Sequence, residues 1–168
     1  MACGIGESSL FEEEPTKFRL NRLPSERVVQ WWPDLAVRVR AACPPPNSTE
    51  NPNAVNTVLA AVIEGSCQIW LWLRRSEGET DVQGILLSQR FAPTISSRTH
   101  LWIEGCSFDT PPTPEQFQEI LSKLKKFARA CGCDCVVLMT DDRPDILAMA
   151  ESLNANTEYR LLQFPVEV

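Results

Sequence analysis

The stretch that decides the fold is LWIEGCSFDTPPTP, residues 101–114, which leads directly into a long amphipathic segment. Its first part is rich in apolar residues, and we expect a core strand over residues 99–104. Thr113, Pro114 and Gln116 then form the start of a helix, with a capping residue, a proline in the first turn and a glutamine that closes a capping box. A strand, a turn and a helix start in this order make the arrangement with which many proteins bind a phosphate-bearing cofactor.

The turn within this stretch lacks the chemistry of a phosphate site. Such a loop offers free backbone N–H groups, which usually calls for glycines. Here Gly105 is accompanied by three prolines, each of which removes a donor. Glu104, Asp109 and Glu115 add negative charge where a pyrophosphate needs the opposite. The sequence therefore predicts the architecture of a cofactor site without its chemistry.

Hydrophobic periodicity on both sides of this stretch predicts the order helix, helix, three strands, long helix, strand, helix, strand. The helices are expected over residues 25–39, 51–64, 114–131 and 144–153, and the strands over residues 67–74, 81–90, 99–104, 135–139 and 158–166. Ser25 is a candidate cap for the first helix. Pro33 is expected to kink or break that helix near Trp32, because a proline disfavours helical geometry in the residue before it. Gly65 and Gly132 are expected to end the second and third helices.

Composition predicts one soluble domain in a reducing compartment. The chain has 168 residues, of which 43% are hydrophobic and 23% charged, and its net charge of −6 argues against nucleic acid or an anionic membrane as partner. No apolar run is long enough for a membrane span, and residues 1–14 lack the features of a secretory signal. The seven cysteines are therefore expected to be free thiols in a protein that is not secreted.

Residues 1–23 and 24–168 are expected to behave differently. The first segment combines Gly, Ser and the acidic run Glu12–Glu14 with a few apolar residues, which predicts a flexible acidic N-terminal arm. This arm is either disordered or docks its apolar residues on the body or on a neighbour. Residues 24–168 are expected to form a single domain.

The order of the expected elements resembles the GNAT-type N-acetyltransferase fold over residues 25–168. Two short motifs, VIEGSCQIWL at 62–71 and FARACGC at 127–133, are similar to GNAT-like proteins that tailed bacteriophages encode near their virion genes. The resemblance implies an α/β architecture with a mixed, twisted sheet of five to seven strands and flanking helices. It also implies that the protein is located in the virion or in the cytoplasm of an infected cell.

In active GNAT enzymes, a Gln/Arg-x-x-Gly-x-Gly/Ala loop after the fourth strand binds the pyrophosphate of acetyl-CoA. A glutamate or a water relay takes the proton of the amine, and a tyrosine often protonates the leaving thiolate. The present turn lacks the second and third required positions of that loop. The single tyrosine, Tyr159, is predicted on the last strand, where packing is its expected role. The resemblance thus implies a degenerate acetyl-CoA site.

The leading hypothesis is a non-catalytic interaction protein, a bacteriophage virion or assembly component present in several copies. This hypothesis predicts that the protein has no catalytic residue, no metal and no cofactor. Its partners would be protein subunits, either virion components or further copies of this chain. Trp31 and Trp32 are the candidate partner contacts, because adjacent residues of one helix cannot both point to the same side.

The alternative hypothesis is a divergent acyl-CoA-dependent N-acetyltransferase. Glu104 or His100 would then act as the base, and the backbone at Gly105, Cys106, Ser107 and Phe108 would bind phosphate. The competing interpretation makes Glu104 a solvated turn carboxylate and His100 a structural residue. Cys131, Cys133 and Cys135 have the wrong spacing for a zinc knuckle or a redox pair, and are expected to fill small spaces at a turn.

Overall fold

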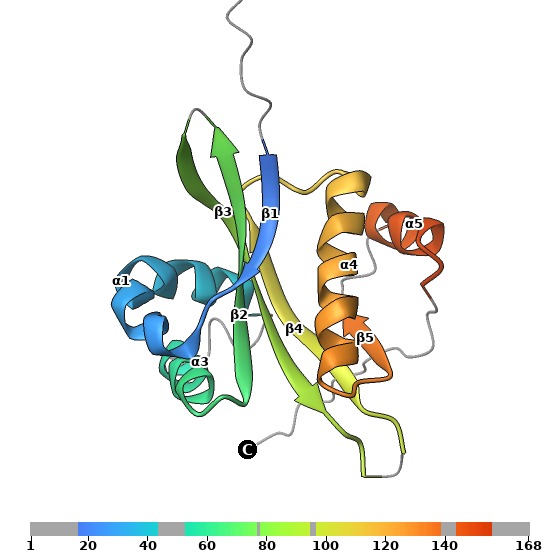
Figure 1. Cartoon of the computed structure of the whole chain (residues 1–168), viewed down its shortest axis with the longest axis horizontal. Coiled ribbons are helices and arrows are strands. Elements are labelled where there is room, and N and C mark those ends of the chain that lie inside the picture. Colours follow the sequence, from blue (N-terminus) through green and yellow to red (C-terminus); the bar gives the residue numbers. More distant parts are fainter. Residues whose placement is uncertain (1–16, 44–52, 77, 95–96, 139–143, 156–168) are drawn as a thin grey trace, which may run out of the picture.

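The computed structural model describes residues 17–43, 53–76, 78–94, 97–138 and 144–155. Its elements, in chain order, are β1 (Lys17–Arg22), α1 (Ser25–Ala42), α3 (Ala54–Ile63), β2 (Cys67–Ser76), β3 (Glu79–Phe91), β4 (His100–Phe108), α4 (Pro114–Ala130), β5 (Cys135–Leu138) and α5 (Pro144–Ser152) (Figure 1). The expected last strand and Tyr159 lie outside the described residues. Within them, none of the helices is both long and apolar enough to span a membrane.

The strands form one mixed sheet in the order β1-β2-β3-β4-β5. The first four pair antiparallel, with α1 and α3 in the connection from β1 to β2 and shorter connections between the next strands, whereas β4 and β5 pair in parallel across α4. A parallel pair needs a crossover connection, and the long helix predicted after residue 113 supplies it. The prediction of a mixed α/β fold with a sheet of five to seven strands and flanking helices is confirmed.

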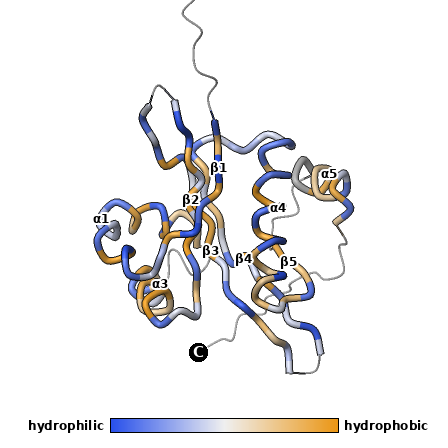
Figure 2. The backbone as a smooth tube through the Cα atoms, in the orientation of Figure 1, coloured by the Kyte–Doolittle hydropathy of each residue, from blue (hydrophilic) through white to orange (hydrophobic). Residues whose placement is uncertain are grey.

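Helices cover both faces of this sheet. Figure 1 shows α1 and α3 on one side and α4 with α5 on the other, and the tube in Figure 2 shows many hydrophobic residues in the strands between them. The expected alternation along β2 is confirmed, since Ile69 and Leu71 pack under α1 and α3, whereas Trp70 and Trp72 pack under α4. One sheet therefore separates two hydrophobic cores.

The start of the chain enters the sheet earlier than expected. Residues 17–22, which the composition predicts to be part of the arm, form β1 and pair with β2, and residues 1–16 lie outside the described residues. Leu20 is buried under α4, and Phe18 stacks on Trp72 with ring centroids 5.4 Å apart. Of the two interpretations of the arm, docking on the body is the one that holds for this part. Burial of these two side chains outweighs the polar composition around them.

The first helix runs through its proline without the expected break. Pro33 lies inside α1, and its ring removes the N–H that would bond to the carbonyl of Val29. Both residues are exposed, so that water can satisfy the carbonyl. Ser25 is the first residue of α1 rather than its cap, a position that Pro24 occupies. Gly65 and Gly132 follow α3 and α4 with φ of 82° and 70°, as the sequence predicted.

Candidate functional site

The first turn of α4 satisfies its own backbone donors. The Thr113 hydroxyl accepts a hydrogen bond from the Gln116 N–H at 3.3 Å, and the Gln116 side chain accepts one from the Thr113 N–H at 2.9 Å. Pro114 has no N–H, and the Glu115 carboxylate accepts hydrogen bonds from its own N–H and from the Thr113 hydroxyl, which lower its pKa. Phe117 N–H bonds to the Thr113 carbonyl. The donors that would face a phosphate are therefore taken by the chain itself.

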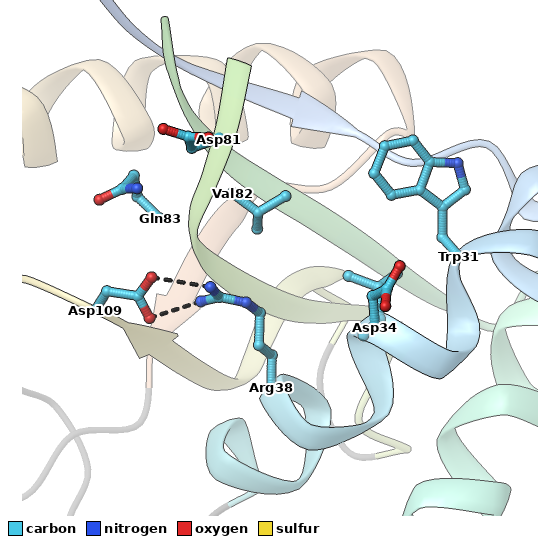
Figure 3. Close-up of a pocket in the computed structure, with 8 residues that line it drawn as sticks. Trp31, Asp34, Arg38, Asp81, Val82, Gln83 and Asp109 are labelled. Atoms are coloured by element: carbon cyan, nitrogen blue, oxygen red, sulfur yellow. Dashed lines mark hydrogen bonds and ion pairs between the residues drawn. The ribbon is translucent and has the colours of Figure 1, made fainter. Parts of the chain in front are cut away.

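The turn before α4 is bound to the opposite side of the sheet by an ion pair. The Asp109 carboxylate accepts two hydrogen bonds from the Arg38 guanidinium of α1, at 2.7 and 2.9 Å (Figure 3). These hydrogen bonds lower the pKa of Asp109. The Asp109 N–H also donates to the Gln83 carbonyl at 2.8 Å, which continues the ladder between β4 and β3. The two-pronged geometry fixes the turn against α1.

The four candidate phosphate-binding residues lie inside β4 instead of in a turn. Gly105, Cys106, Ser107 and Phe108 pair with residues 84–87 of β3, so the expected strand end at residue 104 was four residues too early. Gly84 permits this pairing, because a Cβ there would lie 2.5 Å from the Phe108 ring and 2.7 Å from the Ser107 carbonyl oxygen. The loop that leads to α4 thus starts at Asp109.

Glu104 occupies a bulge in β4. Leu87 pairs with Gly105 and Ser88 with Ile103, which leaves Glu104 as the extra residue. Its side chain is half-buried and accepts a hydrogen bond from the Gln89 amide. Burial raises the pKa of Glu104, and the Gln89 hydrogen bond opposes this rise. Glu104 is therefore part of the sheet, in contrast to the solvated turn carboxylate of the simpler interpretation.

Two core cysteines lie near enough to Glu104 to sense its charge. Burial, and secondarily the Glu104 charge, raise the pKa of Cys67 to about 12, and the same two causes raise that of Cys43. Both thiols belong to the core under α1 and α3. The Glu104 carboxyl thus faces the α1 side of the sheet in a poorly solvated setting.

His100 lies apart from Glu104 and contacts a cysteine. Its Nδ1 is 2.7 Å from the Cys135 Sγ, because the two residues are opposite each other in the parallel pair of β4 and β5. The sequence places them 35 positions apart, and strand alternation alone does not bring them together. In the part of the chain that the structure describes, no three side chains of His, Cys, Asp or Glu are grouped to hold a metal ion.

The space between β4, β5 and α4 is nearly filled. In active GNAT enzymes the fourth and fifth strands splay to admit pantetheine; here β4 and β5 pair from His100↔Cys135 to Ile103↔Leu138, and residues 104–108 of β4 have no partner in β5 among the described residues. Beyond that pair, apolar side chains including Leu86, Phe108 and Phe117 enclose a cavity of only about 30 Å³. About one water molecule fits in such a volume, and small-molecule sites are typically some tenfold larger or more.

A larger pocket lies on the other face, between α1, the start of β3 and the turn after β4. Its volume is about 530 Å³, and Trp31, Asp34, Arg38, Asp81, Val82 and Asp109 contribute to its lining (Figure 3). Trp31 is 40% exposed and stands at one side of the pocket. Trp32 is partly buried against the core under α1 and α3. The two tryptophans therefore point to different sides of α1, and Trp31 is the outward one.

No family model matches this chain, and no curated protein matches it in sequence. Solved structures of acetyltransferases do match in fold. An aminoglycoside acetyltransferase from an uncultured soil metagenomic sample, solved with sisomicin, superposes with a TM-score of 0.61 at 15% identity, over 90% of this chain and 96% of that one. A ribosomal-protein-alanine N-acetyltransferase from Brucella melitensis biovar Abortus 2308 gives 0.58 at 12% identity, over 90% and 100%.

A third match is AAC(6')-Iy in complex with the bisubstrate analogue CoA-S-monomethyl-acetylneamine. Its TM-score is 0.59 at 11% identity, over 90% of this chain and 99% of that one. At such identities the likeness concerns the fold alone, and function has to be argued from the site. Together with the sheet order and the flanking helices, these neighbours establish that the chain has a GNAT-like fold.

Proposed function

We propose that this protein is a non-catalytic GNAT-fold protein that binds other protein subunits and does not use acetyl-CoA. The observation that carries the proposal is the closed first turn of α4. Thr113, Pro114 and Glu115 leave no donor of that turn for a pyrophosphate, and Glu115 adds a negative charge at the helix N-terminus. An anion at this position is opposed by charge and deprived of hydrogen bonds.

The filled space beside α4 supports the same conclusion. A pantetheine arm does not fit into a cavity of about 30 Å³ unless side chains that line it, such as the partly buried Phe108 and Phe117, move. Both the pyrophosphate and the pantetheine of the cofactor therefore lack a prepared place among the described residues.

The resemblance of residues 62–71 and 127–133 to phage-encoded proteins gives the proposal its finer form. In that form the protein is a virion or assembly component of a tailed bacteriophage, it is located in the particle or the infected cell, and its partners are virion subunits or further copies of itself. Trp31 supports a role in binding, since it is an exposed tryptophan beside a pocket.

A divergent N-acetyltransferase is the second candidate, and the bulge at Glu104 favours it. The bulge presents a half-buried carboxyl with a raised pKa toward the α1 side of the sheet. A carboxyl with a raised pKa is a stronger base than a solvated one, which suits it to take a proton from an amine. This candidate still requires a cofactor site other than the closed turn.

Calorimetric titration of the reduced protein with acetyl-CoA and with CoA tests the proposal. We expect no binding heat at millimolar ligand, while an active aminoglycoside acetyltransferase under the same conditions serves as the positive control. Micromolar binding would contradict the proposal. A turnover assay with a panel of amines, run on the protein and its Glu104→Gln and Glu119→Gln variants, would then decide the second candidate, because only Glu104 lies in the bulge.

A further inference from the structure

The pocket beside α1 has an aromatic wall next to a carboxylate. Trp31 and Asp34 are three positions apart on α1, so their side chains are neighbours on one helix face, and both line the pocket. A planar indole face beside a carboxylate suits a cation, which the ring attracts through its quadrupole and the carboxylate through its charge. A guanidinium is the best match because it stacks flat on an aromatic ring and also donates to a carboxylate.

The charges of the pocket leave one carboxylate available. Asp109 is occupied by Arg38, and Asp81 accepts a hydrogen bond from Arg74 at 3.0 Å. No described residue forms an ion pair or hydrogen bond with the Asp34 side chain. The lining thus carries three carboxylates and one guanidinium. Asp34, on the same helix as Trp31, is the carboxylate without a positively charged partner among the described residues.

The surroundings of the pocket indicate a protein as the source of that cation. Among the described residues, five large hydrophobic side chains are exposed, and three of them, Val29, Trp31 and Val37, belong to α1. Val37 is 76% exposed and lies three positions after Asp34, so the two side chains are neighbours on α1. Val29 is two positions from Trp31 and therefore lies on a different side of the helix. A free amine gains nothing from covering Val37, whereas a protein segment buries it.

We infer that the outer face of α1 is a docking surface on which a partner protein inserts an arginine side chain between Trp31 and Asp34. Apolar residues of the partner cover Val37, which flanks Asp34. The inference deepens the proposed function, on which it rests, because it names the chemistry of the bound subunit. The pair of Arg38 and Asp109 forms the far wall of the site and leaves Asp34 to meet the incoming charge.

The test uses two synthetic peptides with blocked ends, Leu-Ala-Arg-Ala-Leu and the same peptide with glutamine in place of arginine. The full chain is titrated with each, and the indole N–H signal of Trp31, assigned with the Trp31→Phe variant, is followed by NMR. We expect a saturable shift with the arginine peptide and at least about fivefold weaker binding of the glutamine peptide.

Matched variants locate the site. Binding to the variants is measured by calorimetric titration, which does not depend on the Trp31 signal. Trp31→Ala and Asp34→Asn should each weaken binding of the arginine peptide by about fivefold or more, with Trp31→Phe in between because phenylalanine keeps a weaker ring. Glu119→Gln, an exposed carboxylate on α4, is the control for Asp34→Asn. Val37→Ser should weaken binding, whereas Ile63→Ser, an exposed hydrophobic residue on α3, should leave it unchanged.

The outcomes separate this inference from the proposed function. Equal binding of the two peptides, or equal effects of Asp34→Asn and Glu119→Gln, would overturn it even if acetyl-CoA fails to bind. Tighter binding of spermidine than of the arginine peptide would overturn it in favour of a free amine. Self-association lost in Asp34→Asn would overturn it in favour of a second copy as occupant. Acetyl-CoA binding with the expected peptide results would contradict the proposed function and leave the docking surface standing.

Discussion

At the scale of single residues, Ser88 is the polar side chain that the described core buries completely. Its hydroxyl accepts a hydrogen bond from the Trp70 indole N–H at 2.9 Å and donates one to the Gln68 side chain at 3.0 Å. Ser88→Ala should lower the free energy of unfolding by about 1–3 kcal/mol, because the buried indole N–H loses its acceptor. Urea unfolding followed by far-UV circular dichroism measures the change.

A double-mutant cycle identifies the cause of this effect. In a Trp70→Phe background no indole N–H remains to be left unsatisfied, so Ser88→Ala should cost clearly less there. The same cost in both backgrounds would mean that the hydrogen bond from Trp70 is not the cause, and that Ser88 acts through its hydrogen bond to Gln68 or through its packing.

The half-buried carboxyl of Glu104 should make the folded protein less stable as the pH rises. Burial raises its pKa in the folded protein above the ordinary value of 4.5, so the folded state binds this proton more tightly than the unfolded chain. The stabilisation of the folded state by the protonated Glu104 carboxyl is fully present below pH 4.5 and is lost as the pH rises through the raised pKa. Glu104→Gln removes the charge and should therefore gain stability relative to the natural protein at about pH 8 but not at about pH 4.

The size of the Glu104 effect is bounded. One proton changes stability by at most about 1.4 kcal/mol per pH unit, and the half-exposed side chain should give less because water screens it. Urea unfolding of both proteins across this pH range measures the difference, and Glu119→Gln on the exposed face of α4 is the control. A difference that stays constant from low to high pH would contradict burial of this carboxyl.

At the scale of elements, the capping box decides how α4 begins. Thr113 uses its hydroxyl and its N–H in two reciprocal hydrogen bonds with Gln116. Thr113→Ala removes the hydroxyl and should lower the free energy of unfolding by about 1 kcal/mol. Ser122→Ala, an exposed substitution in the middle of the same helix, should change it by less than about 0.5 kcal/mol. Similar losses from both variants in urea unfolding would exclude a specific role of the cap.

Local signals made this helix and the two faces of β2 predictable. A capping box, a proline at the first position and a glycine after the last turn are written in adjacent residues, as is the alternation of apolar side chains in a strand. The unpredicted elements depend on distant partners. β1 is a strand because β2 offers an edge, and β4 extends to Phe108 because Gly84 of β3 lets it approach.

The same distinction applies to the site. The sequence indicated a turn with prolines and carboxylates before the long helix, but in the structure that turn starts at Asp109 and Glu104 lies in β4. It did not indicate that Arg38 binds Asp109, since the two lie 71 positions apart, nor that His100 meets Cys135 across a parallel pair. The first contact follows from the packing of α1 against the sheet and the second from strand register, and hydrophobic periodicity encodes neither between separate segments.

At the scale of the whole molecule, one sheet supports two cores, and this arrangement predicts how the chain unfolds. Leu35 of α1 and Ile120 of α4 are 2% and 1% exposed and belong to different cores on opposite faces. Leu35→Ala and Ile120→Ala should each cost about 2–5 kcal/mol, from lost burial and the cavity left behind. Neither core persists without β2 and β3, whose side chains enter both. Tryptophan fluorescence and far-UV circular dichroism should therefore report one shared urea transition in each variant. A transition that splits in Ile120→Ala alone would mean that the α1 half folds without α4.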